Sequence, residues 1–156
     1  MRAILRRRLG LAAGGVAMAL LLAAGAMAAE GEIAMIKTVA GEAVIIRGGQ
    51  RLPAKVGDLL LEKDTIETGP NGTVGITFTD NTVMSAGPNS EVALAEYNFD
   101  SSNFNGSMLT DVEKGTLAVV SGDIARSSPQ AMKIKTPTAI LGVRGTRFTV
   151  EVPSGH

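Results

Sequence analysis

Hydrophobic and polar residues alternate in short runs along the chain from about residue 33 to its end. The clearest run is 73–79, where Val74, Ile76 and Phe78 are separated by glycine and threonine. A period of two places alternate side chains on one face of a β-strand. The run therefore predicts a half-buried strand whose three hydrophobic side chains face a core.

The other runs are equally short and are bounded by glycine, proline, asparagine or aspartate, which favour turns. None of them shows the 3.6-residue period of an amphipathic helix. Strands are expected in residues 33–39, 43–47, 51–56, 64–68, 82–86, 91–97, 108–113, 116–120 and 123–125, with a loop in 98–107. The prediction is an all-β fold, a single compact domain of about ten short strands.

The spacing of the turns leaves the topology open between a sandwich, a barrel and a compact β-roll. Residues 33–39 and 43–47 are expected to form the first pair of strands. Gly41, Gly57 and Gly72 recur at intervals of 16 and 15 residues, as the coils of a solenoid-like roll would. The interval is lost in the second half, so a long regular solenoid is not expected.

Near the end of the chain, two alternating runs flank a segment that cannot continue as a regular strand. The runs are 133–135 and 147–152, and between them Pro137 lacks a backbone N–H. We expect a strand, a corner and a second strand, with Arg144 at the bend between two glycines. The favoured interpretation is a partly buried guanidinium that bonds backbone carbonyls; the alternative is a site for an anionic ligand.

The N-terminal residues have the organisation of a secretory signal peptide. Residues 1–8 contain four arginines and no acid, residues 9–29 are uncharged, and Ala26 and Ala28 form a small-x-small cleavage site. The 21 uncharged residues are also long enough to span a bilayer, so an uncleaved anchor is the alternative. We expect cleavage after residue 28 and export to the periplasm or beyond, with membrane contact only through this segment if it is retained.

Removal of residues 1–28 leaves residues 29–156, the size of one domain. Four of the 15 Lys and Arg residues leave with the signal, so 11 basic residues face 15 acidic ones and the net charge is about −4. This balance does not favour a nucleic-acid partner, which requires a basic face. There is no cysteine and little aromatic content, so the fold depends on an aliphatic core. The oligomeric state is left open.

The chain has few residues suited to catalysis. Its only histidine is His156, and no cysteine is present for nucleophilic chemistry or for thiolate ligation of a metal. A pair of carboxylates can hydrolyse a glycoside, and the candidates near turns are Asp58, Glu62, Asp64, Glu67 and Asp80. The favoured interpretation is that these acids form local hydrogen bonds in turns. We expect neither an enzyme nor a cofactor.

Two polar segments are candidates for calcium binding. Asp80-Asn81 and residues 100–105 offer oxygen ligands for calcium, but neither has the spacing of a known calcium loop, so no metal site is expected.

The loop 98–107 contains Phe99 and Phe104 among small polar residues. Such aromatics either tuck a loop against a sheet or serve as recognition anchors. This loop is the candidate segment for partner contact.

Several short motifs follow one another in a recognisable order. They are Gly41-Glu42-Ala43-Val44, Gly57-Asp58-Leu59-Leu60, Asp64-Thr65-Ile66-Glu67-Thr68-Gly69, Val74-Gly75-Ile76-Thr77-Phe78-Thr79-Asp80, Pro88-Asn89-Ser90-Glu91-Val92, Gly115-Thr116-Leu117, Lys135-Thr136-Pro137-Thr138-Ala139 and Val143-Arg144-Gly145-Thr146-Arg147-Phe148. The ordered set resembles the FecR-type domain, an extracytoplasmic all-β module of bacterial envelopes, over residues 41–150. Asp80-Asn81-Thr82 departs from the usual Asp-Gly-Ser of that family, although asparagine can form the same turn.

The resemblance carries expectations about residues and about domain organisation. It implies a structural role for the last motif, which comprises Thr136, Pro137, Gly142, Arg144, Gly145, Thr146 and Phe148. The best-studied members are membrane-spanning regulators of iron uptake that control a sigma factor through a cytoplasmic segment. Only eight residues precede the apolar segment here, so we do not expect that region in this chain.

Taken together, these features predict a non-enzymatic extracytoplasmic module that binds a protein or an envelope polymer, with envelope signalling as a candidate role. A loop or an open sheet edge would make the contact. The alternatives are a structural, self-assembling envelope component and, less favoured, a small glycan-active enzyme.

Overall fold

A computed structural model describes residues 31–128, 130–145 and 147–154, and the predicted signal segment with Ala26 and Ala28 lies outside them. Twelve strands and one short helix occur in these ranges, which confirms the all-β prediction. The strands are β1 (Ala34–Ala40), β2 (Ala43–Arg47), β3 (Gln50–Pro53), β4 (Leu59–Leu60), β5 (Thr65–Thr68), β6 (Thr73–Phe78), β7 (Val83–Ala86), β8 (Glu91–Asp100), β9 (Asn105–Val120), β10 (Met132–Lys135), β11 (Ile140–Val143) and β12 (Arg147–Val152). The helix, α1, is Asp123–Ser127.

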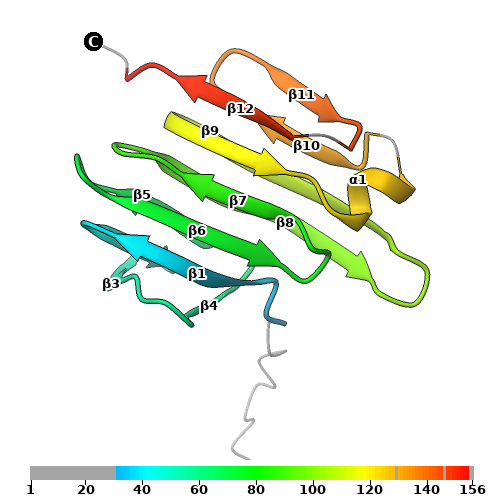
Figure 1. Cartoon of the computed structure of the whole chain (residues 1–156), viewed down its shortest axis with the longest axis horizontal. Coiled ribbons are helices and arrows are strands. Elements are labelled where there is room, and N and C mark those ends of the chain that lie inside the picture. Colours follow the sequence, from blue (N-terminus) through cyan, green and yellow to red (C-terminus); the bar gives the residue numbers. More distant parts are fainter. Residues whose placement is uncertain (1–30, 129, 146, 155–156) are drawn as a thin grey trace, which may run out of the picture.

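The strands form one curled sheet whose two halves pack face to face as layers (Figure 1). The first layer has the order β4-β1-β6-β7-β9-β12, and the second has the order β3-β2-β5-β8-β9-β10-β11. The 16-residue strand β9 belongs to both layers, because its first part pairs with β8 and β10 and its last part with β7 and β12. Neighbouring strands are antiparallel except β9 and β10, which are parallel.

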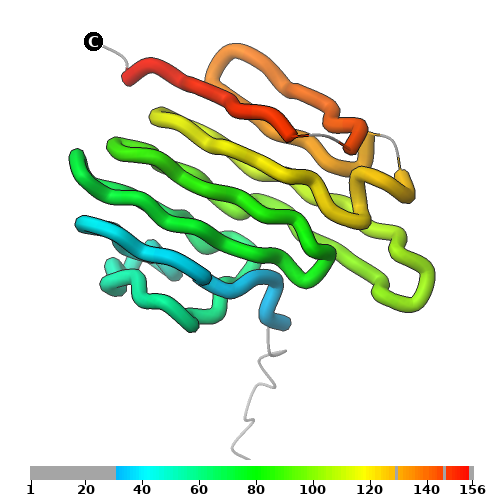
Figure 2. The backbone as a smooth tube through the Cα atoms, in the orientation of Figure 1, coloured from blue at the N-terminus to red at the C-terminus, as the bar shows by residue number. Residues whose placement is uncertain are grey.

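The chain crosses between the two layers repeatedly, as Figure 2 allows the reader to follow. Crossings lie between β1 and β2, β3 and β4, β5 and β6, and β7 and β8. Each contains one of the regularly spaced glycines, Gly41, Gly57, Gly72 and Gly87. The layers therefore pack as a sandwich while the chain winds as a roll. The prediction that 33–39 and 43–47 pair is wrong, since β1 and β2 lie in different layers.

Hydrogen bonds join the corners at which the chain crosses. Gly69 donates its N–H to the Glu42 carbonyl at 2.9 Å, and Asn89 donates to the Gly69 carbonyl at 3.0 Å. The corners approach so closely that a Cβ on Gly41 would lie 2.0 Å from the carbonyl oxygen of Asn71. Glycine at this position is therefore required by the neighbouring corner as well as by its φ of +64°.

The core between the layers is aliphatic, as composition predicts. Val74, Ile76 and Phe78 are all buried, which confirms the orientation expected from their alternation. Phe78 stacks on Tyr97 with the ring centroids 5.4 Å apart. Burying each large aliphatic side chain contributes about 1.5–3 kcal/mol, so the stability of a chain without disulfides rests on this core.

Three local predictions are wrong. Residues 98–107 are not a loop, because β8 and β9 continue as a hairpin as far as the Asp100–Asn105 pair. The separate strands expected in 108–113 and 116–120 are one strand, β9, which bends at Gly115 with a φ of +88° instead of ending there. Residues 123–125 belong to α1, where Asp123 donates its N–H to the Asp80 carbonyl.

No helix in the part of the chain that the structure describes is long and apolar enough to cross a membrane.

Candidate partner interface

The β10–β11 hairpin occupies the corner predicted between 133–135 and 147–152. Thr136 donates its N–H to the Ala139 carbonyl at 2.8 Å, and its Oγ1 accepts the Ala139 N–H at 3.1 Å. Pro137 lies inside this tight turn, where it forfeits no ladder hydrogen bond. The corner is confirmed, but the additional strand β11 was not predicted.

Strand β11 is an edge of the second layer, since among the described strands it pairs with β10 alone. Leu141 is in register with Ile134, which is completely buried, so both side chains face the interior between the layers. Leu141 is nevertheless 42% exposed, and its neighbour Ile140 on the outer face is 66% exposed. The interior is therefore left uncovered along β11, and Figure 1 shows β11 and β12 together at this side of the molecule.

The edges at the other end of the roll are less suited to accept a strand. Strand β3 carries Pro53, which has no N–H to donate, and β4 has only two residues. Prolines and short strands are the usual devices that keep a sheet edge from pairing. Strand β11 has neither proline nor a charged residue, so its free edge remains competent for pairing.

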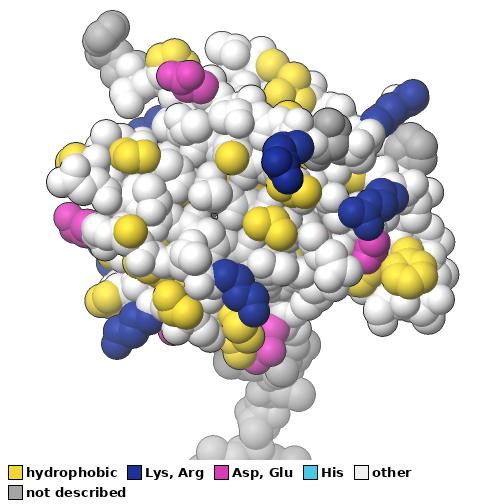
Figure 3. Space-filling view, in the orientation of Figure 1, with side chains coloured by type: hydrophobic (Ala, Val, Ile, Leu, Met, Phe, Trp, Pro, Cys, Tyr) yellow, Lys and Arg dark blue, Asp and Glu magenta, His cyan; other side chains and the backbone are white. Residues whose placement is uncertain are grey.

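The surroundings of β11 are basic. Residues 124–150 contain five basic residues and no acidic one. Two of the five are neutralised by carboxylates: Lys135 by Asp111 at 2.6 Å, which raises the pKa of Lys135, and Arg126 by Asp123 at 3.2 Å. Figure 3 shows basic side chains gathered toward this side, while few charges lie over the centre of the first layer.

Lys133 and Arg144 have no ion-pair partner among the described residues. They line a shallow hollow of about 380 Å³ beside β11, together with Gln130, Ile140 and Gly142. Their charges are therefore available to a ligand that combines negative charge with an apolar contact.

The structure shows Arg144 exposed, and not partly buried as the favoured interpretation expected. At this bend Gly145 has a φ of +55°, a left-handed conformation that glycine adopts readily. Of the other motif residues, Phe148 is half-buried against the core, and Thr146 lies outside the described residues.

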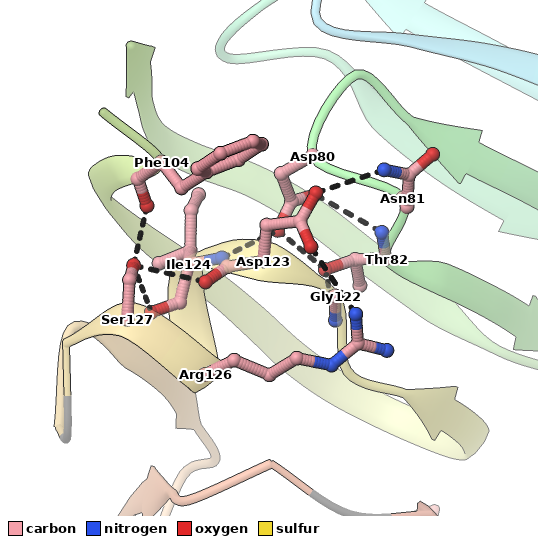
Figure 4. A network of polar contacts seen from close by, with 9 residues as sticks. All are labelled: Asp80, Asn81, Thr82, Phe104, Gly122, Asp123, Ile124, Arg126 and Ser127. Carbon is pink, nitrogen blue, oxygen red and sulfur yellow. Dashed lines mark hydrogen bonds and ion pairs between the residues drawn. The ribbon is translucent and has the colours of Figure 1, made fainter. Parts of the chain in front are cut away.

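The two aromatic residues of segment 98–107 have different environments. Phe99 lies on β8 and packs against the core. Phe104 is 53% exposed at the hairpin turn, with a φ of +59°. Its carbonyl accepts a hydrogen bond from Ser127 of α1, as Figure 4 shows. Phe104 is therefore accessible to a partner, whereas Phe99 is partly buried against the core.

A buried polar network, missed by sequence reasoning, holds α1 in place (Figure 4). Asp80 is completely buried, and its carboxylate accepts hydrogen bonds from the Thr82 hydroxyl at 2.8 Å and the Ile124 N–H at 3.3 Å. The Thr82 hydroxyl accepts the Gly122 N–H at 3.0 Å. The signal in the sequence was Asp80 itself, an acid directly after a strand whose other alternate residues are hydrophobic.

The five acids considered for glycoside hydrolysis all accept hydrogen bonds within the fold. The donors are the Lys55 N–H for Asp58, the Tyr97 N–H for Glu62, the Arg47 guanidinium for Asp64, the Arg51 guanidinium for Glu67 and the Thr82 hydroxyl for Asp80. The hydrogen bond from Arg51 lowers the pKa of Glu67. These contacts give each carboxylate a structural role.

The segments considered for calcium also bond locally. Asp100 accepts hydrogen bonds from the N–H and hydroxyl of Ser102, at 2.9 and 2.6 Å, and these lower its pKa. Asn103 accepts the Asn105 N–H at 2.9 Å. Within the described ranges, no group of acidic or histidine side chains is arranged to hold a metal ion.

Comparison with known proteins identifies the family of the chain. The family model described as FecR protein matches residues 64–156, and thus starts later than the motif resemblance at residue 41. A solved structure described as a cell surface anchoring domain is 31% identical over 40% of this chain and 84% of its own, with a TM-score of 0.39. No curated protein matches. Because the family match covers more than half of the sequence, the chain belongs to the FecR family.

Proposed function

We propose that this FecR-family chain is an exported, non-enzymatic binding module that pairs with a strand of a partner protein through the free edge of β11. The observation that carries the proposal is the 42% exposure of Leu141, a side chain that faces the interior of the roll. A strand added beside β11 would bond the free backbone groups and cover this side chain.

The chemistry of the chain supports a binding role over catalysis. Main-chain pairing needs no special side chains, which suits a sequence with no cysteine and a single terminal histidine. The acids nearest to turns already serve as acceptors within the fold. The basic n-region and apolar segment of residues 1–28 support export, and membership of the FecR family is consistent with an envelope location.

A site-specific photo-crosslinker tests this proposal in intact cells. The crosslinking amino acid would replace Leu141 on β11 or, as a matched control, Leu52 on β3, which has a similar exposure of 38%. We expect capture of one dominant partner from position 141 and little from position 52. Leu141→Lys should abolish capture from a neighbouring crosslinker at Ile140, and Leu52→Lys should not.

Other results would overturn the proposal in distinct ways. Capture of only a second copy of the chain, with a size that grows with concentration, would favour the self-assembling envelope component. Equal capture from positions 141 and 52 would exclude β11 as the specific site. Circular dichroism of each purified variant would first establish that it retains its β-sheet signal.

A further inference from the structure

We infer that the segment received by β11 is acidic and extended, with carboxylates alternating with apolar residues. This inference rests on the proposed function, because it specifies the chemistry of the strand that would pair with β11. It draws on two further observations, which are the alternation of faces along β11 and the unpaired charges beside it.

The alternation on β11 sets the pattern of the incoming strand. Leu141 and Val143 face the interior, while Ile140 and Gly142 face outward beside Lys135 and Lys133 of β10. A strand paired with β11 would continue both faces, since directly opposite residues lie on the same side of a sheet. Its inward side chains would lie beside Leu141 and must be apolar.

The outward side chains of the same strand would meet positive charge. Lys133 and Arg144 have no ion-pair partner in the described parts of the chain, and both line the hollow beside β11. Gly142 adds no side chain between them, and the Gln130 side chain lies beside it, 3.8 Å from where a Cβ would stand. Carboxylates at alternate positions would reach these cations, and each exposed ion pair would add a modest amount to the main-chain bonds.

The same features argue against a second copy of this chain as the strand donor. The exposed edge at the opposite end is β3, whose four residues include Arg51 and Pro53 and no acid. Placed against β11, it would lack one backbone donor. It would also bring no carboxylate of its own to Lys133, and its cation, Arg51, is already paired with Glu67. A partner with an acidic extended segment satisfies both requirements.

Peptide binding to the purified protein tests this inference. The probes are fluorescent peptides of about ten residues that alternate glutamate with valine or lysine with valine, measured by anisotropy at low salt. We expect the glutamate peptide to bind at least about tenfold more tightly, with an affinity that falls as salt increases. N-methylation of its backbone along one edge should weaken binding, because the bonds to β11 need free N–H groups.

Charge reversal supplies the matched variants. The double variant Lys133→Glu, Arg144→Glu should reverse the preference between the two peptides, whereas Lys37→Glu on β1, in the other layer, should leave it unchanged. Equal binding of both peptides, or a glutamate preference that survives the double variant, would overturn the inference. Binding of phosphatidylglycerol vesicles without binding of peptide would overturn it in favour of an anionic lipid surface.

The two proposals fail separately. If position 141 captures a partner in cells while neither peptide binds, the partner role stands and the acidic chemistry is wrong. If the glutamate peptide binds but no protein is captured from position 141, the acidic preference of β11 stands and the cellular role is wrong.

Discussion

The hydroxyl of Tyr97 lies in a half-buried polar site where its ionisation is costly. It contacts the Thr79 hydroxyl at 2.8 Å and accepts the Asp80 N–H at 3.0 Å. Burial raises the pKa of Tyr97 from 10.0 to about 12. Because the unfolded chain loses this proton near pH 10 and the folded chain keeps it to about pH 12, ionisation favours unfolding. The free energy of unfolding should therefore fall as the pH rises between these values.

This prediction has an unusually direct measurement, because the chain has one tyrosine and no tryptophan. The phenolate absorbance of the native protein should show a midpoint near 12, and that of the denatured chain a midpoint near 10. The loss of stability attributable to Tyr97 should be at most about 2 kcal/mol, since the group is only half-buried. A Tyr97→Phe variant should lack this component of the alkaline loss; an unchanged pH profile in that variant would contradict the assignment.

Substitution of the buried acid Asp80 is predicted to destabilise the fold strongly. Asp80→Ala would leave the Thr82 hydroxyl and the Ile124 N–H without their acceptor in a buried site. We expect a loss of about 3–4 kcal/mol in the free energy of unfolding, measured by urea denaturation. Asp100→Ala is the control, because Asp100 is exposed and its bonds to Ser102 are local. A similar loss in both variants would contradict a special role for burial.

At the scale of elements, Gly115 allows β9 to run through both layers. Its φ is +88°, and a Cβ at this position would lie 2.4 Å from the Cα of Ser90. Gly115→Ala should therefore destabilise the protein by more than about 2 kcal/mol, through both backbone strain and a clash. Gly48→Ala is the matched control, because Gly48 has a φ of +55° with open space around it.

Comparison of these two glycine variants in thermal denaturation separates strain from contact. Gly48→Ala should cost only about 1 kcal/mol, the strain of a left-handed backbone with a Cβ. If both variants lose the same stability, the close approach of β9 to Ser90 contributes nothing, and the bend depends on φ alone.

The elements that the sequence predicted correctly are those whose side chains alternate without interruption. Val74, Ile76 and Phe78 on β6 are an example, since each buried position is a large hydrophobic residue. The hairpin of β8 and β9 was missed because one of its faces is exposed and the other only half-buried near the tip, so its residues have the composition of a loop. Helix α1 has five residues, too few to show a period, and depends on a distant partner, Asp80.

The sequence predicted that an open sheet edge would form the site, but it did not identify β11 as that edge. An open sheet edge was expected, but nothing local distinguishes an edge strand such as β11 from a central one. Burial of Ile134 and exposure of Leu141, two residues of similar hydrophobicity, follow from strand order in the folded chain. Arg144 was misjudged for the same reason, because its exposure depends on which strands lie beside its corner.

At the scale of the whole molecule, the strands at the centre of the roll are paired on both sides, and the edge strands at its two ends differ in their capacity to pair. Strand β9 pairs on both sides, with β8 and β10 in one layer and with β7 and β12 in the other. One end of the roll is closed to pairing by Pro53 and the two-residue strand β4, while the other end carries the edge strands β11 and β12. Resistance to local opening should therefore decrease from β9 toward both ends.

Amide hydrogen exchange followed by mass spectrometry or NMR measures this gradient. Amides of β9 in 108–111 and 117–120 should exchange only through global unfolding, because strands flank them on both sides. Amides of β11 that point to its free edge should exchange much faster, as should those of β3. Addition of the glutamate–valine peptide should then slow exchange in β11 and leave β3 unchanged. Equal protection of β11 and β9 in the free monomer would mean that the edge of β11 is already covered, and the proposed pairing would be wrong.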